Sequence, residues 1–369
     1  MSKIAIVGAG KTGRGFIGRL LREADQEMIL IDRDEELVRA LNEAGAFSVH
    51  FFGKEREPLV IDRFQAYTWK DADLQDAELI LVSVGGQNLQ EAGRCLSECL
   101  EENRHYAVIT CENASHPSET LRKAIGKKNA SVSEATVFCT TIEGEGLDIR
   151  SENYPYLQCD ADLLEGYEPG IPQIRPLKHF SNFLTRKLYT YNAASCVIAY
   201  LGWAKGYENY GDAANDEEIL ALLDRNYEAT NRVLCREYGY DEKDQEEFAL
   251  LSRKKFCDRT IEDTVSRNAR DPQRKLAAGE RIIGPIRLLH QYGEDASVLE
   301  KTAAAAILYT APPEEPWTKQ QAEKSSGQIL EEICGIRPDE KLYSNIMNEI
   351  YFLLSCGFPS ETSGCRKLY

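Results

Sequence analysis

Residues 4–13 read Ile4-Ala-Ile-Val-Gly8-Ala9-Gly10-Lys11-Thr12-Gly13, a short apolar run that leads directly into a glycine-rich turn. In a strand–turn–helix unit the first glycine makes the tight turn, the second lets a pyrophosphate approach the backbone, and the third allows close packing. The free N–H groups and positive dipole end of the following helix favour that pyrophosphate. The alternative is a glycine-rich turn without a ligand. We therefore predict a dinucleotide site at Gly8, Ala9, Gly10, Lys11, Thr12 and Gly13.

The charge at the end of the second apolar run bears on which dinucleotide binds. Asp32 follows the run at 28–31, 19 residues after Gly13. A carboxylate at this position accepts hydrogen bonds from the adenosine ribose and repels a 2′-phosphate, which favours NAD over NADP. Arg33 comes next, and its guanidinium is able to offset the charge of such a phosphate. NAD is therefore the expected cofactor, and NADP stays open as the alternative.

Apolar runs alternate with amphipathic stretches through the first 140 residues. We predict strands at 4–7, 28–31, 79–84, 107–110 and 135–138, and helices at 15–24, 35–44, 89–100 and 117–124. Apolar runs without polar alternation are typical of strands that are covered on both faces. Strands that alternate with helices indicate a doubly wound parallel sheet, the Rossmann type of α/β fold.

Two later strand ends supply further candidate cofactor contacts. Ser83-Val84-Gly85-Gly86 ends the third predicted strand, and Cys111-Glu-Asn113 follows the fourth. Ligands of open α/β sheets lie beyond the carboxyl ends of the strands, so we expect Ser83, Val84, Gly85 and Asn113 to line the cofactor. The small residues would let the cofactor lie flat, and the Asn113 amide would face its nicotinamide end. Taken alone, each motif is equally compatible with ordinary turn chemistry.

The pattern changes in the second half of the chain. Helices are predicted at 188–204, 216–238, 244–256, 297–306, 319–334 and 339–354, and strand-like runs become scarce. Residues 144–186 are interpreted as a connector that holds an extra strand or two. We therefore predict an NAD-binding Rossmann domain with its connector over residues 1–184. A mainly α-helical, substrate-binding domain follows over residues 185–369.

Composition excludes several classes of function. The 369 residues carry 44 basic and 60 acidic side chains, a net charge of −16, which disfavours nucleic acid as a ligand. No run reaches the ~20 apolar residues that span a bilayer, so no membrane association is expected. The eleven cysteines form no CxxC pair and the five histidines no HxxxH pair. We therefore expect a cytoplasmic protein with reduced thiols and no metal.

Several motifs are similar to those of a known family. They are residues 8–18, Cys111-Glu-Asn113, Arg186-Lys187-Leu-Tyr-Thr-Tyr-Asn192, Ala199-Tyr-Leu-Gly202 and Arg274-Lys275-Leu-Ala-Ala-Gly-Glu-Arg281. In this order they resemble the mannitol-1-phosphate 5-dehydrogenases of the long-chain mannitol dehydrogenase family, the polyol-specific dehydrogenases. The resemblance covers most of the chain and is weakest towards its end. It implies NAD(H), no metal, a monomer or weak oligomer, and hydride transfer between a polyol or polyol phosphate and the corresponding ketose.

The resemblance also assigns catalytic roles. The family signature is Lys, four residues, Asn, two residues, His, and here Lys187, Asn192 and Ser195 occupy its positions. It implies that Lys187 is the general base in oxidation and the general acid in reduction, and that Asn192 and Asn113 hold the developing oxyanion. A lysine with its usual pKa of ~10.4 would stay protonated. Burial and the cationic nicotinamide both disfavour the charged form and are expected to lower this pKa to ~7–8. The alternative is a solvated surface lysine.

The spacing of these three residues raises a geometric difficulty. Asn192 and Ser195 are three apart and share one face of an α-helix. Lys187 is five residues before Asn192 and lies off that face. We therefore expect Lys187 either to reach round or to precede the helix.

Three positions depart from the family pattern, all where substrate contacts are expected. Ser195 stands where the family has histidine, Glu143-Gly144 replaces an Asp-Arg pair, and Asp258-Arg259 replaces an Asn-Pro segment. A serine hydroxyl exchanges hydrogen bonds but carries no proton at neutral pH. The cofactor motifs, by contrast, are intact. The contrast between changed substrate positions and unchanged cofactor motifs indicates a changed substrate, or reduced activity, with cofactor binding kept.

A basic stretch interrupts the otherwise acidic chain. It contains Arg267, Arg270, Arg274, Lys275 and Arg281, several of them at helical spacing. Guanidinium forks match phosphate oxygens, so Arg267, Arg274, Lys275 and Arg281 are candidate substrate-binding residues, with Lys275 nearest the substrate. The alternative is a solvated helix face with ordinary salt bridges.

Two rivals to a polyol dehydrogenase remain open at this point. One is a dehydrogenase of the same fold that acts on another hydroxy or keto compound, such as a sugar acid or sugar conjugate. The other is a protein that senses NAD(H) without turnover. The joint presence of Lys187, Asn192 and Asn113 argues against the sensor, which has no use for a buried base.

Overall fold

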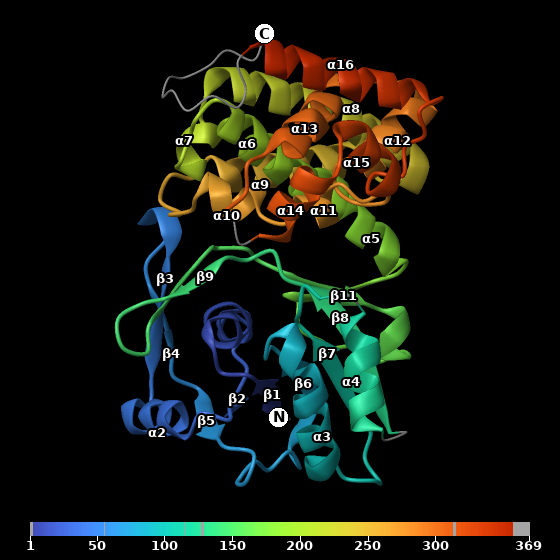
Figure 1. Ribbon diagram of the computed structural model, residues 1–369. Helices are drawn as coiled ribbons and strands as arrows, with labels where there is room; N and C mark the ends of the chain where they lie inside the picture. The colour runs from blue at the N-terminus through green and yellow to red at the C-terminus, as the bar shows by residue number, and fades with distance from the viewer. Residues whose placement is uncertain (1–2, 55, 115, 127–128, 313–314, 357–369) are drawn as a thin grey trace. The chain divides into compact units, whose positions relative to one another are not determined.

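The computed structural model describes residues 3–54, 56–114, 116–126, 129–312 and 315–356. Backbone contacts divide the chain into two compact units, residues 1–183 and 184–369. The strands gather in the first unit, and helices make up the second (Figure 1). No helix in the described part of the chain is long and apolar enough to cross a membrane.

The first unit is built on an eight-stranded sheet in the order β12-β11-β8-β7-β6-β1-β2-β5. Its strands are β1 Lys3–Val7, β2 Met28–Ile31, β5 Phe64–Tyr67, β6 Ala77–Val82, β7 Tyr106–Thr110, β8 Ala130–Thr136, β11 Leu157–Asp160 and β12 Ile174–Leu177. The six from β5 to β8 are parallel, whereas β11 runs antiparallel to β8. The chain builds β2 and β5 on one side of β1 and then returns to add β6, β7 and β8 on the other. This confirms the predicted doubly wound Rossmann-type sheet.

Side-chain alternation along the strands produces two buried layers. Ile4 and Ile6 of β1 join one core cluster with the helices on their side, η1 Gly13–Gly18 (a π-helix), α1 Arg19–Glu23 and α2 Glu35–Ala44. Ala5 and Val7 face the opposite cluster, which is covered by α3 Leu89–Cys99 and α4 Pro117–Ile125. Because successive side chains of a strand point to opposite faces, an unbroken apolar run fills both layers.

A second, smaller sheet has the order β4-β3-β10-β9, which the sequence did not predict. Its strands are β3 Phe47–Phe51, β4 Leu59–Ile61, β9 Thr141–Glu143 and β10 Ile149–Ser151. Short 3-10 turns lie at η2 Phe52–Lys54, η3 Gly86–Asn88 and η4 Asp162–Leu164. These strands are three to five residues long, too short for hydrophobic periodicity to reveal.

The strand expected at 135–138 is wrong in position, because β8 covers Ala130–Thr136. Its buried positions include Ser131 and Ser133, so the strand does not show as an apolar run. The Ser133 hydroxyl donates to the Asp160 carbonyl at 2.7 Å, which satisfies its polarity inside the sheet.

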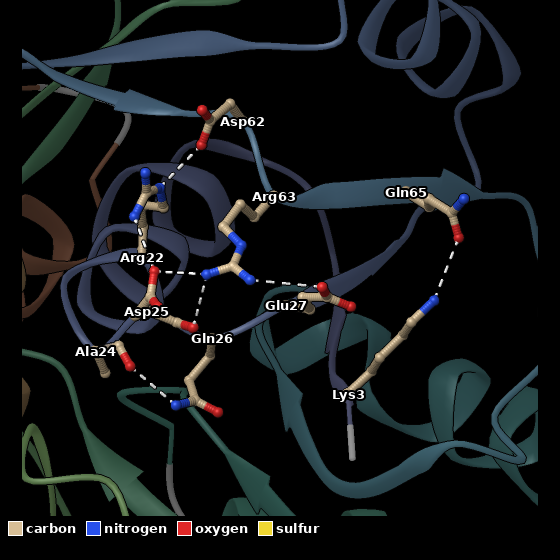
Figure 2. A network of polar contacts seen from close by, with 9 residues as sticks. All are labelled: Lys3, Arg22, Ala24, Asp25, Gln26, Glu27, Asp62, Arg63 and Gln65. Carbon is tan, nitrogen blue, oxygen red and sulfur yellow. Dashed lines mark hydrogen bonds and ion pairs between the residues drawn. The ribbon is translucent and has the colours of Figure 1, made fainter. Parts of the chain in front are cut away.

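Polar contacts fasten the amino ends of β1, β2 and β5 to their neighbours (Figure 2). Arg63 pairs with Asp25 at 2.5 Å and with Glu27 at 3.5 Å. Arg22 pairs with Asp62 at 2.9 Å. Each of these exposed pairs adds little stability. They lie at the amino ends of the strands, whereas the glycine loop follows the carboxyl end of β1.

In its described residues the second unit consists of helices, their connecting segments and a β-bridge between Asn209 and Thr264. Its helices are α5 Phe180–Lys187 (which begins in the first unit), η5 Leu188–Asn192 (a π-helix), α6 Ala193–Ala204, α7 Tyr210–Ala214, α8 Glu217–Tyr238, α9 Glu242–Phe256, α10 Val265–Ala269, α11 Pro272–Lys275, α12 Ile283–Tyr292, α13 Ser297–Leu308, α14 Pro316–Glu323, α15 Ser326–Glu332 and α16 Lys341–Ser355. The helix α6 is apolar on all sides and is surrounded by α7, α8, α10 and α13. A helix with this pattern forms the centre of a core.

The helices α7, α10, α11 and α12 were not predicted, and two predicted helices are divided differently along the chain. The single helix expected at 319–334 is two helices, α14 and α15, because Ser325 begins a new helix with a capping box to Gln328. The predicted helix at 188–204 instead continues a helical run that starts at Phe180, with η5 between α5 and α6. This second difference decides the geometry of the candidate catalytic residues.

Candidate functional site

The glycine loop between β1 and η1 shows a distinct reason for each glycine. Gly8 has φ +95°, and a Cβ added there would lie 2.0 Å from the Ser83 carbonyl oxygen. A Cβ on Gly13 would lie 1.9 Å from the Gly8 carbonyl oxygen. At Gly10, by contrast, an added Cβ meets nothing within 4 Å. The loop is thus closed by two tight backbone contacts and leaves open space at the glycine where a pyrophosphate is expected to approach.

Asp32 ties this loop to the end of β2. One carboxylate oxygen accepts from the Ala9 N–H at 2.7 Å, and the other accepts from the Asp34 N–H at 3.0 Å. On the other side, Arg14 Nε donates to the Ala9 carbonyl at 2.6 Å. Lys11 is exposed, and the Thr12 hydroxyl lies 3.3 Å from that of Thr141. The carboxylate that was expected to meet a ribose therefore has a fixed orientation beside the glycine loop.

A cavity of ≈ 220 Å³, partly open to solvent, lies over the carboxyl ends of β1, β2 and β6. Six of the predicted cofactor residues line it: Gly8, Gly10, Asp32, Arg33, Ser83 and Val84. The other lining residues, which the sequence did not identify as cofactor contacts, include the polar or aromatic Trp69, Asn88 and Glu91. Trp69 was missed because β5, the strand that precedes it, was not recognised. Glu91 was missed because it reads as an ordinary residue of the first turn of α3.

Arg33 and Glu91 face each other at the cavity. Arg33 Nη1 lies 3.6 Å from Glu91 Oε2, and both side chains are largely exposed. This pairing draws the guanidinium towards α3, and it places an additional negative charge on the cavity wall.

The Cys111-Glu112-Asn113 motif, which follows β7, hydrogen-bonds to the neighbouring loops. Glu112 Oε1 accepts from the Gly85 N–H at 2.7 Å, across to the turn after β6. Burial raises the pKa of this carboxyl, while the N–H groups of Gly85 and Val84 oppose the shift. Asn113 donates to the Val137 carbonyl at 2.8 Å and accepts from the Val137 N–H at 3.1 Å. One amide N–H of Asn113 is therefore used to bind the segment after β8, and its oxyanion role stays a prediction.

In the second unit, the π-helix η5 resolves the expected conflict between Lys187 and Asn192. Ala193 N–H donates to the Leu188 carbonyl, the five-residue step that defines a π-turn. In an α-helix, positions five apart are rotated by about 140° around the axis. The π-turn winds less per residue than an α-helix, so Lys187, which ends α5, and Asn192, which ends η5, lie closer to one side than α-helical geometry would place them. Lys187 lies within the helical run and does not precede it.

Ser195 lies in the first turn of α6 and has a buried partner. The Tyr210 hydroxyl lies 3.3 Å from Ser195 Oγ and donates to it. Burial raises the pKa of Tyr210 well above its usual value of 10, so the phenol stays protonated. The Ser195 oxygen is thus occupied as an acceptor, which leaves its own proton to be donated elsewhere.

Positive charges gather around Lys187. Lys187 is only partly exposed, and desolvation, together with the neighbouring charges of Lys255 and Arg281, lowers its pKa to about 7. Lys275 is 5% exposed, and burial lowers its pKa to about 8. Its Nζ donates to the Asn268 carbonyl and lies 5.6 Å from the centre of the Tyr200 ring. An ammonium with a pKa near 7 exchanges protons at neutral pH.

The basic stretch does not form one helix face. It is divided between α10, α11 and the segment before α12, with a break at Asp271, whose φ is +59°. Arg267 pairs with Asp263 at 3.0 Å and Arg274 with Asp271 at 2.6 Å, both in exposed positions. Arg281, with a side chain only 15% exposed, pairs with Glu280 at 3.0 Å. Lys275 and Arg281 are therefore the inward members of the stretch, whereas Arg267 and Arg274 face surface carboxylates and Arg270 is exposed.

The other departures from the family pattern lie at the surface. Arg259 pairs with Asp212 at 3.6 Å, with both side chains exposed. Glu143 ends β9 and is exposed. Within the described ranges no group of three or more His, Cys, Asp or Glu side chains is placed to hold a metal ion.

Comparison with known protein families gives two adjacent matches. Residues 2–142 match the mannitol dehydrogenase Rossmann domain, and residues 179–329 match the mannitol dehydrogenase C-terminal domain. Among curated relatives, the mannitol-1-phosphate 5-dehydrogenase of Pseudarthrobacter chlorophenolicus is 27% identical, covering 92% of this chain and 94% of its own. The Bacillus pumilus enzyme of the same name is 28% identical, covering 93% of this chain and 98% of its own.

Solved structures show the same fold at low sequence identity. A D-sorbitol dehydrogenase aligns with a TM-score of 0.73 and 13% identity, covering 95% of this chain and 93% of its own. The mannitol 2-dehydrogenase of Pseudomonas fluorescens, solved with NAD and D-mannitol, aligns with a TM-score of 0.63 and 15% identity, covering 96% and 94%.

The glycine loop yields a test of stability. Gly13→Ala forces a Cβ against a backbone oxygen, so we expect it to lower the free energy of unfolding by about 1–3 kcal/mol. Gly10→Ala meets open space and should leave stability unchanged. Thermal unfolding of both variants checks this, and equal melting temperatures would contradict the close contact at Gly13.

Proposed function

This chain belongs to the mannitol dehydrogenase family, a family of oxidoreductases, and from that premise we propose that it interconverts a polyol phosphate and the corresponding ketose phosphate with NAD(H). The proposal is carried by Lys187, which desolvation shifts to a pKa of about 7, standing five residues before Asn192 in a helical run that contains a π-turn. The relatives named mannitol-1-phosphate 5-dehydrogenase support a phosphorylated hexitol as the substrate class.

The first unit provides what a nicotinamide dinucleotide requires. Open space at Gly10 suits the pyrophosphate, and the Asp32 carboxylate at the end of β2 suits the adenosine ribose. The cavity between these features has room for the adenosine portion. When bound, the nicotinamide supplies the hydride acceptor or donor.

Lys187 and Asn192 perform the proton and charge chemistry of the substrate oxygen. In alcohol oxidation the neutral amine of Lys187 takes the hydroxyl proton, and in ketone reduction its ammonium returns it. The Asn192 amide donates to the same oxygen as negative charge develops there. One such preorganised donor typically contributes ~3–4 kcal/mol to transition-state stabilisation. Asn113 is proposed as the second donor.

The inward cations support a phosphorylated substrate. Arg281 acts electrostatically on Lys187, and Lys275, Arg281 and the more exposed Arg274 act on Cys196, one residue after Ser195, where Glu280 opposes them. Such a local excess of positive charge in a protein of net charge −16 suits a small dianion. We therefore assign phosphate binding to Lys275 and Arg281. The exposed, carboxylate-paired Arg267 and Arg274 are assigned at most a steering role.

Ser195 favours a second candidate, a related substrate whose carbonyl region differs from that of a simple hexulose phosphate. A sugar acid or sugar conjugate belongs to this class. The observation behind it is the hydrogen bond from Tyr210, which takes up one acceptor position of the Ser195 hydroxyl. An imidazole at this position would offer a different pattern of donors and acceptors.

The pH dependence tests the role of Lys187. Because reduction requires the protonated ammonium, kcat/KM for NADH with fructose 6-phosphate should fall about tenfold per pH unit above pH 7. For NAD with mannitol 1-phosphate, kcat/KM should rise up to pH 7 and then level off. Initial rates between pH 5.5 and 9 check both directions.

The matched variant is Lys187→Met, which should abolish turnover and still bind NADH, measured by fluorescence titration. A flat pH profile in the wild-type protein would refute the assignment of the base. NADH binding without turnover on any ketose or sugar acid would instead support the sensor hypothesis.

Substitution at Ser195 tests substrate choice. We expect Ser195→His to raise kcat/KM for fructose 6-phosphate about tenfold, because the imidazole restores the family pattern around the lysine. Steady-state kinetics on a panel of ketose phosphates and sugar acids measure the change. If wild type already reduces fructose 6-phosphate efficiently and the histidine variant gains nothing, the interpretation of Ser195 is wrong.

The Arg33–Glu91 pair tests cofactor choice. Wild type should prefer NADH, because Asp32 and Glu91 both oppose a 2′-phosphate and Glu91 holds Arg33. Glu91→Gln should improve binding of NADPH about fivefold, the usual effect of one exposed charge. The double variant Glu91→Gln/Arg33→Ala should lose most of this gain. If it keeps the full gain, Arg33 has no part in cofactor choice.

A further inference from the structure

We propose that Gln245 is a positioning residue, because its amide holds the π-turn that brings Lys187 and Asn192 to one side of the helix. The inference rests on the proposed function, since it explains how the proposed base acquires its geometry. Gln245 lies on α9, far along the chain from both residues, and nothing in its sequence context marks it as functional.

The Gln245 amide is fully buried and bonded in three directions. Its Oε1 accepts from Arg186 Nε at 2.6 Å. Its Nε2 donates to Thr190 Oγ1 at 3.1 Å and to Asn231 Oδ1 at 2.9 Å. Both N–H groups are used and the side chain is 0% exposed, so the amide has one orientation.

Two of these bonds bracket the critical junction. Arg186 directly precedes Lys187 in α5, and Thr190 lies in the middle of η5. The Thr190 side chain is also fully buried. The Gln245 amide on α9 therefore hydrogen-bonds to one residue before and one residue after the point where α-helical geometry changes to π-helical geometry.

Further contacts fix the position of Arg186, the residue that donates to Gln245. Arg186 pairs with the Asp244 carboxylate at 2.8 Å and donates to the Asp244 carbonyl at 2.9 Å. Its guanidinium lies 4.3 Å from the centre of the Phe248 ring and 4.5 Å from that of Tyr240. A buried guanidinium held by charge, hydrogen bonds and aromatic faces is a firm anchor.

A π-turn needs such support because it is a rare departure from the α-helical hydrogen-bond pattern. If the turn relaxes to α-helical geometry, Asn192 comes to lie about 140° around the helix axis from Lys187. The Asn192 amide and the Lys187 amine would then no longer contact the same substrate oxygen. A misplacement of about 1 Å is already able to reduce catalysis by about 100-fold.

The experiment compares Gln245→Leu with Ser252→Ala. Leucine keeps the volume of Gln245 and removes its three hydrogen bonds. Ser252 lies on the same helix, is also fully buried, and bonds the Tyr227 hydroxyl without contacting η5. Both variants lose buried hydrogen bonding in α9, so a purely structural role predicts similar behaviour.

Two readouts are measured beside thermal unfolding. The first is the pKa of Lys187, from its rate of acetylation by acetic anhydride between pH 5.5 and 10, followed by peptide mass spectrometry. The second is kcat with NADH and a ketose phosphate. We expect Gln245→Leu to raise the labelling pKa by about one pH unit and to lower kcat at least about tenfold. Ser252→Ala should leave both unchanged.

A second pair of variants covers the case in which Gln245→Leu does not fold. Thr190→Val keeps the shape of the side chain and removes the hydroxyl that binds Gln245. Thr190→Ser keeps the hydroxyl. We expect the valine variant to show the raised pKa and lower kcat, and the serine variant to remain close to wild type.

Equal labelling pKa values in Gln245→Leu, Ser252→Ala and wild type would overturn the inference and leave Gln245 as a core residue. So would equal behaviour of Thr190→Val and Thr190→Ser. The labelling pKa needs no turnover, so it tests this inference even if no carbonyl substrate is reduced. Absence of turnover in the wild-type protein would count against the proposed function alone.

Discussion

A buried ammonium group beside other cations is the condition on which the proposed chemistry depends. In water, lysine stays protonated at neutral pH and has no basic lone pair to offer. Here burial and the charges of Lys255 and Arg281 lower the pKa of Lys187 to about 7. The arrangement costs folding energy, because the charged form is disfavoured wherever it is desolvated. A protein without a use for a neutral amine would more simply place a leucine or methionine there.

The two units carry different candidate groups. The first supplies open backbone at Gly10 and a carboxylate at Asp32, features that suit a dinucleotide without specifying a reaction. The second supplies the titrating lysine, the amide of Asn192 and the inward cations. The departures from the family pattern affect this second set most, because Ser195 is bound to Tyr210 in place of a free imidazole. Membership of the family therefore defines the class of reaction, whereas the substrate depends on a few side chains around Lys187.

The strand–helix alternation and the glycine loop were predictable because their signals are local. An unbroken apolar run such as residues 4–7 reports a strand buried on both faces, and the close contact at Gly13 is made with Gly8 in the same loop. Among the strands that were missed or misplaced, β5 and β8 mix apolar with polar residues. Their polar groups are satisfied by partners from other parts of the chain, as Ser133 is by Asp160. No local pattern records such partners.

The chain's own residue order was enough to reveal the fold class, the family motifs and the identity of the candidate base. It did not reveal the π-turn, the cavity residues Trp69 and Glu91, or which members of the basic stretch point inward. Each of these depends on atoms far apart in the chain, such as the Gln245 amide and the Thr190 hydroxyl, 55 residues away. Hydrophobic period and residue spacing describe an ideal helix. The departure from that ideal at residues 188–192 arises only where buried side chains of another helix make it favourable.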